Sequence, residues 1–224
     1  VATFDQVVTP IFEGRAGDFG ATQLQQMWEL LPLGASDPAA ALAWYSRHQA
    51  AGAPLHSRML MVTDGVATAG AAEGFDLRTA AASLREAEVD RLDVLASGGL
   101  SDLAAQRGLV NAGLPHDGLV IDASVGPPAI AARMSRATVA GLKIEVEGAD
   151  WVWPETLDAL QRGDEAVITA QVPPGQPVVI RVGGQPVRGT VDAGMAPLVE
   201  RVAASSRIDR LVHLRDTVYA RDPD

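Results

Sequence analysis

The chain contains no cysteine among its 224 residues, which excludes disulfide bonds, thiolate metal sites and a cysteine nucleophile. Aromatic residues are also scarce, at 4% of the sequence, so the core must be built mainly from aliphatic side chains and alanine. Hydrophobic residues still make up 47% of the chain. That content is enough for a sizeable core in one large domain or two small ones.

Positive charge is in short supply. Lysine and arginine together number 18, against 28 aspartates and glutamates, and the formal net charge is −10. No basic cluster offsets this balance, so we expect no nucleic-acid partner. No apolar stretch reaches the roughly 18 residues of a membrane span, and we expect none in this chain. The four histidines are scattered, with no spacing typical of metal ligands.

The most informative stretch is residues 57–70, SRMLMVTDGVATAG, an apolar run that stops at Asp64 and Gly65. This pattern predicts a buried parallel strand over residues 57–63 that carries an acid to the carboxyl edge of a sheet. Open α/β sheets bind their ligands at that edge. Because strand and helix patterns alternate around it, we predict that this strand is the centre of a doubly wound domain.

The α/β pattern runs to about residue 135. It predicts two short extended runs over 1–12 with a reversal near Asp5, helices over 21–31, 39–51, 77–88, 101–112 and 129–135, and strands over 91–96 and 118–121. The first helix carries its apolar side chains at positions 24, 27, 28 and 31. Ser36 or Asp37 is expected to cap the second helix, with Pro38 in its first turn.

From residue 136 onward the pattern changes. Alternating apolar residues over 139–147, 167–172 and 178–182, separated by glycine and proline turns, predict antiparallel strands. Trp151 and Trp153 share one strand face and are expected to be largely covered. A closing helix over 197–219 has Leu198, Val202, Ile208, Leu211 and Val212 on its apolar side. We therefore divide the chain into an α/β domain, 1–135, and a β-rich segment with a C-terminal helix, 136–224.

Several motifs together resemble a known family. FDxxV at residues 4–8, LGASDPAAAL at 33–42, MLMVTDGVATAG at 59–70 and RLDVLASGGLSD at 91–102 are similar to a von Willebrand factor A domain. The nearest variety is that of bacterial proteins related to inter-alpha-trypsin inhibitor heavy chains, whose following β segment resembles WVWPETLDALQRG at 151–163. The resemblance implies a Rossmann-like, mostly parallel sheet flanked by helices, then a small antiparallel segment and a helix.

The same resemblance implies a metal-ion-dependent adhesion site for Mg²⁺ or Mn²⁺, in which Ser36 and Asp64 match two of the three ligand loops. The family's first strand and its DxSxS motif have no counterpart here, so the resemblance implies that this central strand is lacking and that strand edges are left unpaired. Asp122-Ala123-Ser124 begins like DxSxS, but it lacks the last serine and we interpret it as a mimic. One carboxylate and one hydroxyl leave most of about six ligand positions to water, so a weak site is expected.

Three functions remain open from the sequence. The first is a non-enzymatic protein-binding module, whose partner completes the metal site with an acidic side chain. The second is a metal-free structural part of a larger multidomain protein, in which Asp64 only forms a turn and Ser36 or Asp37 only caps a helix. The third, a hydrolase or transferase using Asp64 or Asp122, is the weakest, because no nucleophile and base are recognisably spaced. The sequence predicts no compartment: a parent with a signal peptide would be periplasmic or at the cell surface, and otherwise cytoplasmic.

Overall fold

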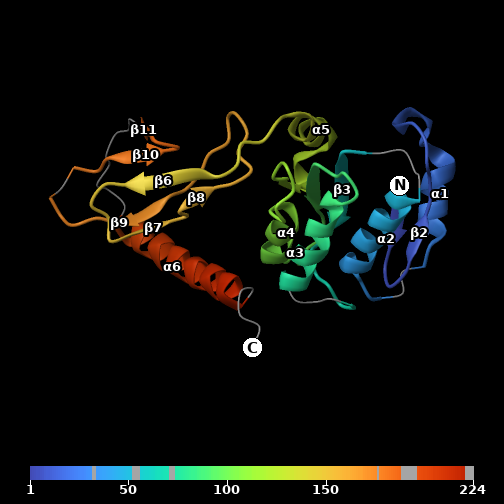
Figure 1. The fold of residues 1–224 in the computed structure, drawn as a ribbon, viewed down its shortest axis with the longest axis horizontal. Coiled ribbons are helices and arrows are strands. Elements are labelled where there is room, and N and C mark those ends of the chain that lie inside the picture. The colour runs from blue at the N-terminus through green and yellow to red at the C-terminus, as the bar shows by residue number, and fades with distance from the viewer. Residues whose placement is uncertain (32–33, 52–55, 71–73, 176, 188–195, 220–224) are drawn as a thin grey trace. The chain divides into compact units, whose positions relative to one another are not determined.

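The structure is a computed structural model that describes residues 1–31, 34–51, 56–70, 74–175, 177–187 and 196–219. The chain forms two compact units, Val1–Arg136 and Ala137–Asp224 (Figure 1). Among the described residues, no helix is both long enough and apolar enough to cross a membrane.

The first unit contains a parallel sheet of three strands in the order β3-β4-β5. These strands are β3 (Arg58–Thr63), β4 (Arg91–Ala96) and β5 (Val120–Asp122). Met61 lies opposite Val94, and Ala96 lies opposite Asp122. The prediction of a parallel sheet flanked by helices is confirmed, and the apolar runs expected over 57–63, 91–96 and 118–121 form its three strands.

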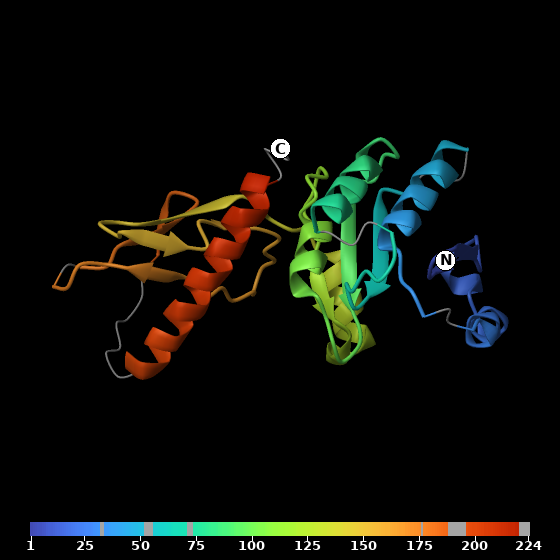
Figure 2. The ribbon, with the colours of Figure 1, turned by 90° about the horizontal axis from the view of Figure 1, so that it is seen from below.

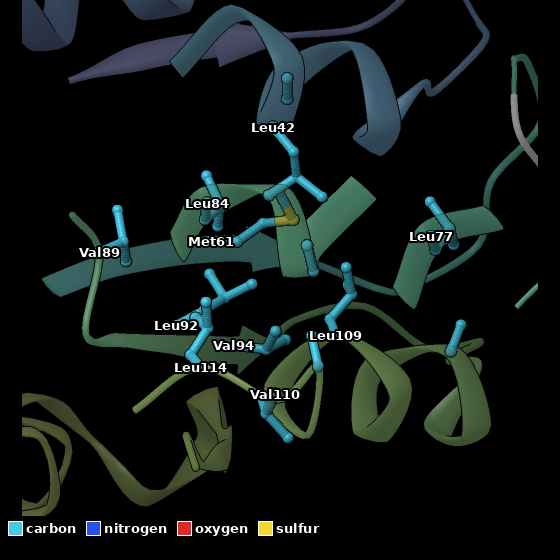
Figure 3. Close-up of a cluster of buried hydrophobic side chains, with 14 of the residues drawn as sticks. Leu42, Met61, Leu77, Leu84, Val89, Leu92, Val94, Leu109, Val110 and Leu114 are labelled. Atoms are coloured by element: carbon cyan, nitrogen blue, oxygen red, sulfur yellow. The ribbon is translucent and has the colours of Figure 1, made fainter. Parts of the chain in front are cut away.

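Three helices supply the core on one face of this sheet. They are α2 (Pro38–Ala50), α3 (Gly74–Ala82), which continues into the short 3-10 helix η2 (Ser83–Arg85), and α4 (Leu103–Val110). Figure 3 shows Leu42 of α2, Leu84 of η2 and Leu109 of α4 gathered around Met61 of β3. The core is aliphatic, as the composition predicted.

The start of α2 resolves the choice between two predicted caps. Asp37, and not Ser36, is the N-cap: its carboxylate Oδ1 accepts a hydrogen bond of 2.9 Å from the Ala40 N–H, and Pro38 occupies the first turn. Asp102 caps α4 in the same way, through the Ala105 N–H at 2.9 Å. Both caps lie at the end of the unit where the strands β3 and β4 finish.

The other face of the sheet is covered unevenly. The Arg91 side chain, on this face, donates a hydrogen bond of 2.8 Å to the Arg136 carbonyl directly after α5 (Pro127–Ser135), and Ile121 of β5 is buried. Leu60 and Val62 of β3 belong to the same face, because side chains alternate along a strand, and both are exposed.

The prediction that residues 57–63 form the centre of the sheet is wrong. Within the described residues β3 pairs only with β4, and it is therefore an edge strand. The extended runs at the N-terminus, β1 (Ala2–Phe4) and β2 (Val8–Pro10), pair with each other as an antiparallel hairpin and do not extend the sheet. Phe4 and Val8 pack against the aliphatic core cluster that the sheet and the three helices form. Figure 2 shows the hairpin on the β3 side of the unit.

The helix predicted over residues 21–31 forms as α1 (Ala21–Glu29), but its apolar side is not packed. Trp28 is 83% exposed, and Leu24 is also exposed. The spacing of apolar residues therefore predicted the helix but not a partner for it.

The second unit is built from short antiparallel strands, as predicted. They are β6 (Leu142–Val146), β7 (Trp151–Trp153), β8 (Thr156–Leu157), β9 (Thr169–Gln171), β10 (Ile180–Val182) and β11 (Gln185–Val187). One sheet has the order β11-β10-β6-β8, and β7 pairs with β9 in another. The long helix α6 (Ala196–Tyr219) follows.

The helix α6 contacts β7 and β9 through polar and charged side chains. The Arg207 guanidinium lies 5.3 Å from the centre of the Trp151 ring, and the His213 ring lies 5.3 Å from that of Trp153. Both tryptophans are half-buried, which is less cover than expected. The predicted apolar side of α6 is the exposed one: Leu198, Val202, Ile208, Leu211 and Val212 all remain accessible.

Candidate functional site

The candidate site lies where β3 ends. Asp64 follows the last residue of β3, and its carboxylate Oδ1 accepts a hydrogen bond of 2.9 Å from the Val66 N–H. The Thr63 hydroxyl accepts another, of 3.0 Å, from the Gly65 N–H. Asp64 therefore shapes its own turn, which is one of the two roles that the sequence left open for it.

Gly65 is required by this turn. Its φ is +83°, and a β-carbon at this position would lie 2.7 Å from both the Asp102 carbonyl oxygen and the Gln106 Cγ. A larger residue would meet backbone on one side and a fully buried side chain on the other. The Asp102 N–H donates a hydrogen bond of 2.9 Å to the Asp64 carbonyl, which also ties the start of α4 to this turn.

Ser36 is joined to the loop that follows Asp64. The Ser36 N–H donates to the Thr68 hydroxyl at 2.7 Å, and the N–H groups of Thr68 and Ala69 donate to the Ser36 carbonyl at 2.9 and 3.1 Å. These three bonds hold the segment before α2 and the loop after β3 in one cluster. Ser36 and Asp64, which were singled out by sequence, thus belong to connected loops at the carboxyl edge of β3.

Asp122 lies at the carboxyl end of β5, at the same edge of the sheet. Its Oδ1 accepts a hydrogen bond of 2.8 Å from the Ser124 N–H. This bond lowers the pKa of Asp122 below its ordinary value. The residues that begin like DxSxS form the 3-10 helix η3 (Ala123–Val125), so Asp122 acts as the cap of a short turn.

The donor set around Ser36 and Asp64 is small for a divalent cation. It offers the Asp64 carboxylate, the Ser36 hydroxyl and the Thr68 hydroxyl, which accepts from the Ser36 N–H, whereas the Asp37 carboxylate caps α2. In the part of the chain that the structure describes, no group of three or more His, Cys, Asp or Glu side chains is arranged to hold a metal. Mg²⁺ and Ca²⁺ take six or more oxygen ligands, so these residues fit only a loosely held ion.

The chain matches no protein-family model, no curated protein and no solved structure. The resemblance to von Willebrand factor A domains therefore depends on the quoted motifs alone.

Two features of this unit were missed by the sequence reasoning. Thr68 lies in a loop of small residues, and nothing local marks it as the partner of a residue 32 positions away. The second feature is Asp93, which is fully buried within β4 and bonded to Arg91 and Arg58. The sequence did carry a signal for Asp93, since it is an acid inside an otherwise apolar strand and follows Arg91 by two residues.

Proposed function

We propose that the chain is a non-enzymatic protein-binding module, and that it recognises its partner at the carboxyl edge of β3. The observation that carries the proposal is the cluster in which three hydrogen bonds join Ser36 to Thr68 and Ala69, four and five residues after Asp64. This cluster carries two hydroxyls, and the turn just before it carries the Asp64 carboxylate, on loops held by a packed sheet. Loops on a rigid scaffold are where binding residues concentrate.

Each side chain has a defined role in this proposal. The Val66 N–H orients the Asp64 carboxylate, and the Thr68 hydroxyl fixes the backbone of Ser36. Asp64 and Ser36 would hold Mg²⁺ or Mn²⁺ weakly, with water at the other positions. A bound cation would supply positive charge for an acidic side chain of the protein partner, on a chain whose formal net charge is −10.

The proposal predicts that binding of a carboxylate depends on the metal. A short blocked peptide with one glutamate should bind the full chain in Mg²⁺ or Mn²⁺, with a Kd of about 1 mM or weaker given the small donor set. The same peptide should not bind in EDTA, and its glutamine version should not bind in either condition. Isothermal titration calorimetry or peptide NMR measures all four combinations.

Substitutions at the edge of the sheet test whether the metal-dependent binding occurs at Ser36 and Asp64. Asp64→Asn and Ser36→Ala should abolish or strongly weaken the metal-dependent binding, whereas Asp122→Asn, at the same edge of the sheet, should leave it unchanged. Equal loss in Asp64→Asn and Asp122→Asn would contradict the site.

The second candidate is a metal-free structural part of a larger protein. It is favoured by the local hydrogen bonds of Asp37 and Asp64, since a helix cap and a turn account for both carboxylates. Absence of any metal-dependent heat or peptide binding would select this candidate.

A further inference from the structure

One edge of β3 is free of ladder partners among the described residues. The Ser57 carbonyl accepts from the Arg91 N–H at 3.2 Å, and the Thr63 carbonyl accepts from the Ser97 N–H at 3.3 Å. The odd-numbered residues of this strand therefore direct their backbone groups toward β4. In a parallel pair the intervening residues point to the other side, so the N–H and C=O groups of Arg58, Leu60 and Val62 face the free edge.

The same residues present apolar side chains on the face opposite the core. Leu60 is 37% exposed and Val62 is 55% exposed. Parallel sheets normally have both faces covered, so this exposure is unusual. The other edge strand, β5, offers much less, because it has three residues and its Ile121 is 1% exposed. Unpaired backbone and accessible apolar surface thus coincide only at β3 within this sheet.

Arg58 lies on the same face of β3 as Leu60 and Val62, because side chains alternate along a strand. Arg58 Nη2 lies 3.1 Å from Asp93 Oδ2, while Asp93 Oδ1 accepts a hydrogen bond of 2.8 Å from Arg91 Nε. Two guanidinium groups therefore share one carboxylate. The Arg58 side chain is 41% exposed, and the buried Arg91 Nη2 has no hydrogen-bond partner within the part of the chain that the structure describes. The amino end of the edge thus carries a partly exposed guanidinium, that of Arg58, which shares the Asp93 carboxylate with Arg91.

We propose that the free edge of β3 binds an extended segment of a separate protein chain by strand addition. The segment would place a carboxylate against Arg58 and apolar side chains against Leu60 and Val62, at alternate positions. Backbone hydrogen bonds give affinity in this mode, and the alternate side chains give specificity. The net charge of −10 does not oppose this binding strongly, because physiological salt screens charges beyond about 8 Å. The edge site needs no metal and is independent of the proposed function.

The test uses the full chain in EDTA, so that failure of the metal site leaves the result unaffected. Two blocked peptides of about nine residues, within the usual range of strand lengths, carry Glu, Val and Leu at alternate positions, with threonine between them and lysine at both ends. One has the order for a parallel strand and the other the reverse order. One of the two should slow hydrogen exchange at the amides of Leu60 and Val62, measured by NMR, more than at that of Met61.

The predicted contact between the peptide's glutamate and Arg58 is tested separately, by comparing the affinities of two peptides. Replacing the peptide's glutamate by glutamine should weaken binding about threefold to tenfold, the range of a charge-assisted hydrogen bond at a partly exposed site. The difference should vanish in the variant Arg58→Gln, which completes a double-mutant cycle.

Variants of the strand test the backbone and apolar contacts. Leu60→Pro removes an N–H at the free edge without removing a bond to β4, and it should weaken binding about tenfold. Val62→Lys should weaken binding while the chain melts as before, which guards against misfolding of the proline variant. Val125→Lys, at a residue that is 49% exposed on η3, is the matched control and should bind normally.

Three results would overturn the proposal. The first is the absence of protection at Leu60 and Val62 with either peptide. The second is unchanged binding in Val62→Lys. The third is protection of these amides without peptide in a concentration-dependent dimer, detected by light scattering, since a second copy would then occupy the edge.

Discussion

Asp93 is the most constrained single residue in the first unit. It is fully buried, and its Oδ1 accepts hydrogen bonds of 2.8 Å from both Arg91 Nε and the Leu119 N–H. Its second oxygen is bonded to Arg58. A buried carboxylate is tolerated only when such partners compensate for the loss of water. The bond to Leu119 also ties β4 to the segment that leads into β5.

Removing this charge should destabilise the unit strongly. Asp93→Asn leaves two guanidinium groups without their counter-charge, and we expect a loss of about 3–5 kcal/mol in the free energy of unfolding. Urea denaturation followed by circular dichroism measures it. Glu145→Gln, which breaks the exposed pair with Lys143, should change stability very little. A comparable loss in the two variants would show that burial of Asp93 is not what matters.

At the scale of elements, α6 is the clearest departure from a simple amphipathic helix. Arg207 Nη2 donates a hydrogen bond of 2.6 Å to Gln171 Oε1 and its guanidinium lies over Trp151. Ser206 and Thr169 are joined through their hydroxyls at 2.8 Å. The helix is therefore attached to β7 and β9 by polar contacts, while Ile208, the next residue after Arg207, is 61% exposed.

Two adjacent substitutions in α6 should therefore behave oppositely. Arg207→Ala should lower the free energy of unfolding of the second unit by about 1–2 kcal/mol, through loss of a cation–π contact and a hydrogen bond. Ile208→Ala should stay within about 0.5 kcal/mol, because an exposed side chain makes few contacts. Tryptophan fluorescence during urea unfolding reports on both. A larger loss for Ile208→Ala would mean that the apolar side of the helix is packed in solution.

Periodicity predicted which elements form, but not where they pack. The apolar run at 59–62 reads the same in a central strand and in an edge strand whose other face is open, so the position of β3 could not be predicted. The spacing of apolar side chains in α1 and α6 predicted both helices correctly, yet the apolar side of each helix is exposed. Ser36 and Asp64 followed from a motif, whereas Thr68 could not, because its contact with Ser36 spans 32 residues of sequence.

At the scale of the whole molecule, the chain combines two units with different sheet chemistry. The first, Val1–Arg136, has a parallel sheet and the aliphatic core cluster. The second, Ala137–Asp224, has antiparallel strands, with Ile144 and Val146 as buried hydrophobic residues. The change in hydrophobic period near residue 136 predicted this difference, because parallel strands buried on both faces read as continuous apolar runs and antiparallel strands alternate. Both proposed binding sites belong to the first unit, at the carboxyl edge of β3 and at its lateral edge.

Paramagnetic NMR with Mn²⁺ tests the central claim most directly, namely that Ser36 and Asp64 form a binding site at the carboxyl edge of β3. Bound Mn²⁺ broadens the amide signals of nearby residues and so locates its own site. We predict selective broadening at Ser36, Asp64 and Thr68 at Mn²⁺ concentrations well below saturation, reversed by EDTA and lost in Asp64→Asn. Uniform broadening over the acidic surface, or broadening centred on Asp122 that persists in Asp64→Asn, would contradict the account.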